Sequence, residues 1–111
     1  MIDHGSERRV LRRSLRHLAC EVEVEGVSTK AVILNLSARG LLVRTNAKAL
    51  VGVPAVVRIR RPGGLVWELD AEVARLRERD QAPASARGLG LEILLAPPGF
   101  EEFVAEIGRQ S

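Results

Sequence analysis

Apolar and polar residues alternate in six short segments that cover most of the chain between residues 18 and 95. The clearest segment is 21–25, where two valines alternate with three glutamates in the period of two that typifies a strand with one buried face. Turns that contain Gly, Ser, Asn or Pro separate the segments. The pattern predicts six strands, at 18–25, 29–36, 40–45, 55–60, 65–73 and 88–95.

A helical pattern follows the last predicted strand. Large apolar residues recur at a helical spacing after a Pro-Pro-Gly turn, at Phe100, Phe103, Val104 and Ile107. Two glutamates stand in the first turn, where the helix dipole favours negative charge. Because a helix of about nine residues is marginal in isolation, we expect residues 99–108 to dock on the strands through this apolar stripe.

Six antiparallel strands and one helix in a chain of 111 residues fit a small barrel or sandwich, and a barrel leaves no sheet edge exposed. We therefore predict a mainly β fold, a six-stranded antiparallel β-barrel over residues 18–95 with one C-terminal α-helix. Residues 1–7 are expected to be a flexible tail. Residues 8–111 are expected to be a single domain.

The composition restricts the core and the surroundings of the protein. With one Trp, two Phe and no Tyr, the core must be built from Val, Leu, Ile and Ala, and Trp67 is expected to join it in phase with Leu65 and Leu69. The single cysteine, Cys20, excludes an intrachain disulfide and indicates a reducing compartment. No run approaches the roughly 20 apolar residues of a membrane span. We expect a cytoplasmic protein without membrane insertion.

Basic residues cluster near the N-terminus, with five arginines between Arg8 and Arg16. A guanidinium group offers a planar fork of donors that fits phosphate and the O6/N7 edge of guanine. A GC-rich genome would explain frequent arginine but not this clustering. We expect residues 8–17 to form an extended arm rather than a helical turn. The later arginines are expected on a solvated surface, although one of them near the mouth of the barrel could touch a ligand. They are Arg58, Arg60, Arg75, Arg77 and Arg79.

A small polar motif lies between the second and third predicted strands. Asn35 and Ser37 would point to the same face of an extended chain. Gly40 tolerates a positive φ and a close approach of the backbone to a ligand. Because Asn, Ser and Gly are also the commonest turn residues, the motif alone is compatible with a binding site and with an ordinary turn.

Taken together, these features resemble the PilZ domain family of bacterial cyclic di-GMP receptors. The arm contains Arg-x-x-x-Arg, and Asn35-Leu36-Ser37-Ala38-Arg39-Gly40 fits the pattern Asp/Asn-x-Ser-x-x-Gly. The six strands and the terminal helix follow in the same order as in the family. Gly88-Leu89-Gly90 also resembles the family's late Gly-x-Gly strand. The resemblance extends over residues 7–107.

The position of the Arg-x-x-x-Arg motif within the arm has three solutions. The spacing fits Arg8/Arg12, Arg9/Arg13 and Arg12/Arg16. We favour Arg9/Arg13, because a charged lead-in then precedes the motif and a reasonable gap separates it from the first strand. Arg12 stands where the family often has proline, and Asn35 stands where Asp is commoner.

The resemblance implies a receptor that binds cyclic di-GMP and has no catalytic activity, metal or cofactor. Arginines would bond the phosphates and guanine edges, and an extra guanidinium at Arg8 would stack on a second ligand molecule. Ordering of the arm would change the surface offered to an unidentified partner protein. The expected ligand-binding residues are Arg8, Arg9, Arg13, Asn35, Ser37 and Gly40, with Arg12, Arg39 and Gly90 as further candidates.

Catalysis and two other functions are weighed against this expectation. His4, His17 and Cys20 form no recognisable catalytic motif and are too few for a zinc site. A PilZ-like adaptor that works only through protein contacts remains an alternative. A small nucleic-acid-binding barrel is the weaker alternative, because stacking aromatic residues are scarce. The chain is expected to be a monomer or a weak homodimer.

Overall fold

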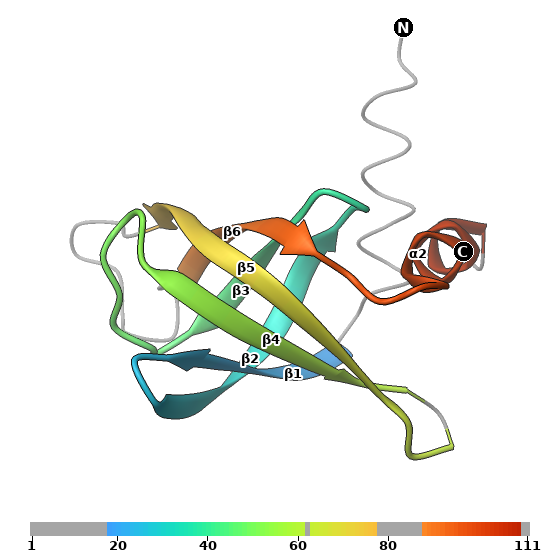
Figure 1. The fold of residues 1–111 in the computed structure, drawn as a ribbon, viewed down its shortest axis with the longest axis horizontal. Coiled ribbons are helices and arrows are strands. Elements are labelled where there is room, and N and C mark those ends of the chain that lie inside the picture. Colours follow the sequence, from blue (N-terminus) through green and yellow to red (C-terminus); the bar gives the residue numbers. More distant parts are fainter. Residues whose placement is uncertain (1–17, 62, 78–87, 110–111) are drawn as a thin grey trace, which may run out of the picture.

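The protein forms a closed barrel of six antiparallel strands followed by one helix (Figure 1). The structure, a computed structural model, describes residues 18–61, 63–77 and 88–109. The strands follow each other around the barrel in the order β1-β2-β3-β6-β5-β4. Their bounds are β1 Leu18–Val24, β2 Val27–Leu36, β3 Gly40–Thr45, β4 Pro54–Arg60, β5 Val66–Arg77 and β6 Gly88–Leu95, and the helix is α2, Phe100–Arg109.

The predicted fold class is confirmed, and each predicted element is present within a few residues of its expected bounds. The predicted tail 1–7 and arm 8–17 lie outside the described residues. No helix in the described part of the chain has the length and apolar character that crossing a membrane would require.

The first hairpin turns earlier than the sequence pattern predicts. Val24 pairs with Val27, so the loop consists of Glu25 and Gly26 alone. Their φ angles are 52° and 82°, and two positive φ values are typical of the type I′ turn, whose twist suits adjacent antiparallel strands. The expected turn at 26–28 is therefore wrong, because Gly26 supplies the positive φ and Val27 already belongs to β2.

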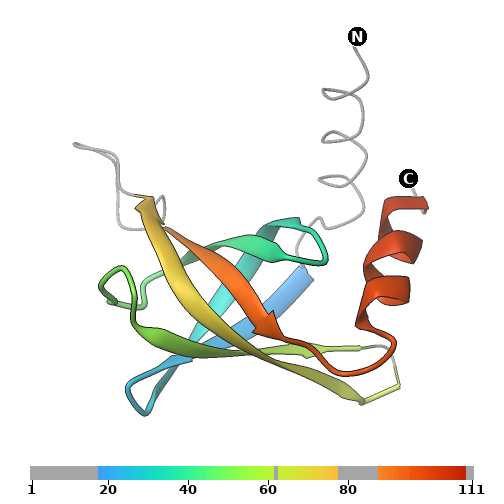
Figure 2. The same cartoon turned by 45° about the horizontal axis from the view of Figure 1, so that its top comes forward.

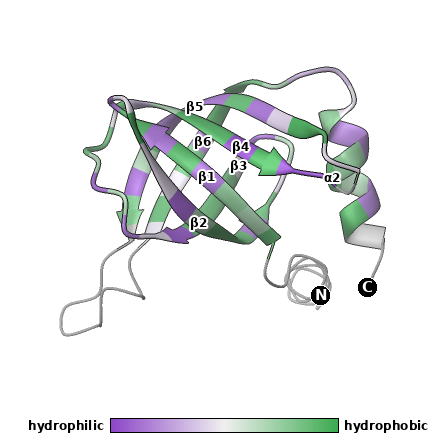
Figure 3. Cartoon of the chain, turned by 90° about the horizontal axis from the view of Figure 1, so that it is seen from below, coloured by the Kyte–Doolittle hydropathy of each residue, from purple (hydrophilic) through white to green (hydrophobic). Residues whose placement is uncertain are grey.

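The core fills the inside of the barrel through strict alternation along the strands. Val22, Val43, Val57, Leu69 and Val73, from β1, β3, β4 and β5, are fully buried. Outward positions between them are mostly polar, which appears in Figure 3 as alternating hydrophobic and hydrophilic bands. Burial of aliphatic side chains is therefore the main favourable contribution to the stability of this barrel.

Leu65 does not join the core, although the pattern predicts it. It is 60% exposed, because β5 begins only at Val66 and Leu65 belongs to the turn after β4. In that turn the backbone N–H of Arg61 donates to the carbonyl of Leu65 at 2.7 Å. Trp67, the next inward residue, is buried as expected.

Helix α2 is attached to the barrel through an aromatic cluster. The ring centroids of Trp67 and Phe100 lie 5.7 Å apart at a steep angle of 77°, and Phe103 lies 5.5 Å from Trp67. The Arg61 guanidinium stands 4.3 Å from the centroid of the Trp67 ring, in cation–π geometry. Figure 2 shows α2 beside the barrel, where the loop after β6 delivers it. Ile107 is also buried in the core cluster, and Val104 packs against that cluster, so the predicted docking of the apolar stripe is confirmed.

Candidate functional site

Ser37 closes the turn between β2 and β3. Its backbone N–H donates to the carbonyl of Gly40 at 2.8 Å, and its hydroxyl donates to the same carbonyl at 3.2 Å. The hydroxyl oxygen also accepts from the N–H groups of Arg39 and Gly40, at 3.3 and 3.1 Å. Its donor and both of its lone pairs are thus used within the turn. Ser37 fixes the backbone of the motif.

Asn35 reaches the outer face of the barrel through an irregularity in β2. The pairing of β2 with β3 shifts between Ile33 and Asn35, so Leu34 is an extra residue there. Asn35 then pairs with Leu42, and the strand ends at Leu36. The expectation that Asn35 and Ser37 share a face assumed an uninterrupted strand. That assumption is wrong, because β2 ends at Leu36 and Ser37 lies in the turn.

A neighbouring strand leaves no space for a side chain at Gly40. Its φ is not positive, so the position does not need the conformational freedom of glycine. A Cβ atom on Gly40 would lie 2.9 Å from the carbonyl oxygen of Leu91 in β6, which is closer than real Cβ atoms approach backbone. Close packing of β3 on β6 therefore explains this glycine without any ligand.

Strand pairing arranges four residues in a row across the outer face. Asn35 pairs with Leu42, Leu42 with Gly90, and Gly90 with Arg75, so the row crosses β2, β3, β6 and β5. A Cβ atom on Gly90 would lie 2.8 Å from Cγ and 3.0 Å from Nε of Arg75. The side chain of Arg75 therefore lies over Gly90, in the same row as Asn35.

Arg75 is a candidate site residue, which the sequence analysis placed among five surface arginines of which one could touch a ligand. The Arg75–Gly90 pair depends on a second shift in strand pairing, between Val73 and Arg75, which no local pattern reveals. Arg39, one of the further candidates, is exposed at the tip of the hairpin. Its carbonyl accepts from the N–H of Ile93 at 2.8 Å, which ties the tip to β6.

The described chain begins close to this row. Arg8, Arg9, Arg12 and Arg13 lie outside the described residues. The described chain begins at Leu18, which pairs with Ile33, two positions before Asn35 on β2. The arm therefore joins the barrel within a few residues of the polar motif.

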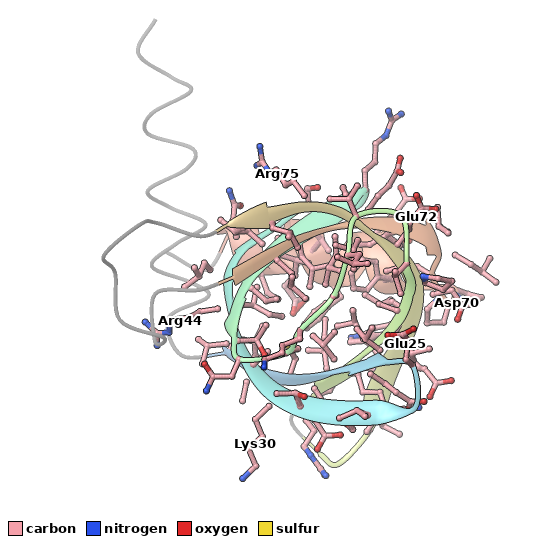
Figure 4. All side chains as sticks on the ribbon, turned by 90° about the vertical axis from the view of Figure 1, so that its left-hand side faces the viewer. Glu25, Lys30, Arg44, Asp70, Glu72 and Arg75 are labelled. Atoms are coloured by element: carbon pink, nitrogen blue, oxygen red, sulfur yellow. The ribbon has the colours of Figure 1, made fainter. Side chains whose placement is uncertain are left out.

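Charge is unevenly distributed around the barrel. In Figure 4, Arg75, Arg44 and Lys30 project from one side, and Glu72, Asp70 and Glu25 lie toward the other. Elsewhere on the outer face, Arg58 donates to the carboxylates of Glu23 and Glu68, at 2.9 Å each. These hydrogen bonds, led by the one to Glu68, raise the pKa of Arg58. Its charge is thus matched by its own neighbours.

The described residues hold no cluster of side chains suited to a metal ion. Burial raises the pKa of the Cys20 thiol to about 12, with a smaller contribution from the charge of Glu21, so the thiol is protonated at neutral pH. The described part of the chain contains no group of three or more His, Cys, Asp or Glu side chains placed to hold a metal ion. His4 and His17 lie outside it.

The chain matches the model of one protein family over most of its length. The family model of the PilZ domain matches residues 7–105, which include the arm, the motif from Asn35 to Gly40 and all six strands. A comparison with curated proteins found no match. The matched region covers most of the 111 residues. The chain therefore belongs to the PilZ domain family.

Proposed function

We propose that this protein is a receptor for cyclic di-GMP and has no enzymatic activity of its own. The main support is the family match over residues 7–105, together with the place at which the described chain begins. The arm joins β1 at Leu18, beside the part of β2 that carries Asn35. Arginines of the arm and the outer row of the barrel would therefore face the same ligand.

The chemistry of the residues suits this ligand, which carries two phosphates and two guanine bases. Arg9 and Arg13 would bond phosphate oxygens or the guanine O6/N7 edge in a bidentate manner. The amide of Asn35 would bond a base edge. Arg75 adds a cation on the barrel side, where its side chain lies over Gly90. Ser37 would act indirectly, because its hydroxyl is used in holding the turn.

Signalling would follow from ordering of the arm. Binding of the ligand between residues 8–17 and the barrel would fix a segment and so change the surface offered to a partner protein. The partner would be a separate protein in the cytoplasm. If Arg8 stacks on a second guanine, the complex would contain two ligand molecules for each chain, and a titration that gives one would exclude this arrangement.

The arm arginines provide the direct test of this proposal. Arg9→Ala and Arg13→Ala should each abolish cyclic di-GMP binding in an equilibrium titration, while the circular dichroism of the barrel stays unchanged. Lys48→Ala, which removes one exposed cation from the loop after β3, is the matched control and should bind normally. Arg16→Ala should also bind normally, because only the Arg12/Arg16 solution uses that residue. Normal binding by both Arg9→Ala and Arg13→Ala would refute the assignment.

A PilZ-type adaptor without nucleotide binding is the second candidate function. One observation favours it: the Ser37 hydroxyl is fully used within its own turn, so this part of the motif has a structural role without a ligand. A nucleic-acid-binding barrel is disfavoured. The chain has three aromatic residues, and Trp67, Phe100 and Phe103 all pack against one another at the helix, where they offer no stacking surface.

A further inference from the structure

A groove of about 550 Å³ lies on the outer face of β1–β4, and its lining does not include Asn35, Ser37 or Gly40. It is formed by a row of residues in which short side chains separate long ones. Arg44 of β3 pairs with Val32 of β2, and Val32 pairs with Ala19 of β1. On the other side of β1, Cys20 pairs with Ile59 of β4, so Arg60 is the β4 residue opposite Ala19. The floor thus lies at Ala19 and Val32, between two arginines.

A row of alternating charges bounds the groove on one side. Glu21 pairs with Lys30 on one neighbouring strand and with Arg58 on the other. Arg58 is held by Glu23 and Glu68, as described above. By contrast, no carboxylate within residues 18–61, 63–77 and 88–109 forms an ion pair with Arg44 or Arg60. Both arginine residues are exposed.

The lining combines an apolar floor with an excess of positive charge. Val66, which is 46% exposed and pairs with Arg60, extends the apolar floor toward β5. The lining contains four cationic side chains and one carboxylate, Glu21, which stands between two of those cations. The volume falls in the range of sites for small organic ligands. Guanidinium groups bind carboxylates bidentately and also stack on flat rings.

We propose that this groove binds a small organic anion with an aromatic or apolar body and a carboxylate group. The body would lie on Ala19 and Val32, and the carboxylate would accept from Arg44 or Arg60. None of Asn35, Ser37 and Gly40 lines the groove. The proposal therefore concerns a second site, which stands or falls independently of cyclic di-GMP binding.

The test is an NMR titration of the ¹⁵N-labelled full chain with 1-naphthoate, with the neutral isostere 1-naphthamide as control. The backbone amides of Ala19, Val32 and Arg44 should shift and saturate with naphthoate. The amide should bind about tenfold more weakly, because it lacks the charge-assisted hydrogen bonds. Absence of saturable shifts at these amides, or equal binding of the two compounds, would overturn the proposal.

Substitutions in the groove locate the binding. Arg44→Ala and Arg60→Ala, both at exposed positions, should each weaken naphthoate binding about tenfold or less. Ala19→Trp, also exposed, should fill the groove and abolish it. Lys48→Ala removes one charge elsewhere and should have no effect. Equal affinities in Arg44→Ala, Arg60→Ala and the unaltered chain would overturn the proposal even if Ala19→Trp failed to fold.

Addition of cyclic di-GMP to the naphthoate-saturated protein separates the two sites. We expect the shifts at Ala19, Val32 and Arg44 to persist. Displacement of naphthoate, with loss of these shifts, would mean that the groove belongs to the nucleotide site and would overturn the proposal of a second one. A protein that fails to bind cyclic di-GMP but binds naphthoate would refute only the proposed receptor function.

Discussion

Ser37 forms a closed set of hydrogen bonds with Arg39 and Gly40, and this set defines what the residue can do. A hydroxyl with all its partners inside a turn has no free donor for a ligand. It can still set the position of the neighbouring N–H and C=O groups. The main role of Ser37 is therefore to stabilise the turn between β2 and β3. Direct contacts with a ligand would come from Asn35 and the arginines around it.

Substitution of Ser37 separates these roles. Ser37→Ala should lower the free energy of unfolding by about 1 kcal/mol, since it removes the hydrogen bonds that close the turn. Ser37→Thr keeps the hydroxyl and should retain most of the stability. Urea denaturation measures the effect, and cyclic di-GMP affinity should fall by a similar free energy. Unchanged stability together with lost binding would mean that the hydroxyl contacts the ligand directly.

Cys20 gives the stability a specific dependence on pH. Its pKa is raised on folding from 9.0 to about 12, mainly by burial, so the folded state favours the protonated thiol. This contribution is fully present below pH 9.0 and is lost as the pH rises toward 12. Urea denaturation of the native chain and of Cys20→Ala at pH 7 to 10 should show a steeper loss in the native chain above about pH 9. Parallel profiles would contradict the burial argument.

At the scale of elements, α2 depends on a small aromatic contact. Phe100 is 2% exposed and packs edge-on against Trp67, while most of the other residues of the helix are partly or fully exposed. A short helix of this kind is stable only when it is docked. The cluster of Trp67, Phe100 and Phe103 is thus the principal attachment of the helix to the barrel.

Removal of the Phe100 ring tests this attachment. Phe100→Ala should lower the free energy of unfolding by about 3–5 kcal/mol, through lost burial and the cavity left behind. The emission of Trp67, the only tryptophan, should shift to longer wavelength as its environment becomes wetter. Glu102→Ala on the exposed side of the helix is the control and should change stability by less than about 0.5 kcal/mol. A native-like emission spectrum in Phe100→Ala would contradict the role of the cluster.

The elements could be predicted because their signals are local. The valines of β1 alternate with glutamates, and the apolar stripe of α2 has a helical period. The details of the site depend instead on residues that are distant in sequence. Gly40 is explained by the carbonyl of Leu91, and Arg75 reaches Gly90 only through shifted pairing of β5 with β6. Local patterns contain no information on such contacts.

At the scale of the whole molecule, closure of the barrel brings residues from distant parts of the chain together. The first strand lies beside β2, so the described chain begins near Asn35, and β6 lies between β3 and β5, so Arg75 enters the same outer row. The sequence alone shows neither relation, because both depend on the barrel topology. Positive side chains on one side of the molecule would further favour the approach of an anionic ligand (Figure 4).

Isothermal titration of the purified chain with cyclic di-GMP tests the central claim most directly, with GTP and a short DNA duplex as controls. We predict saturable binding of cyclic di-GMP and no measurable binding of either control. Absence of cyclic di-GMP binding by a protein shown to be folded would contradict the receptor function and favour the adaptor. Binding of the DNA duplex instead would contradict our interpretation of the arginine arm.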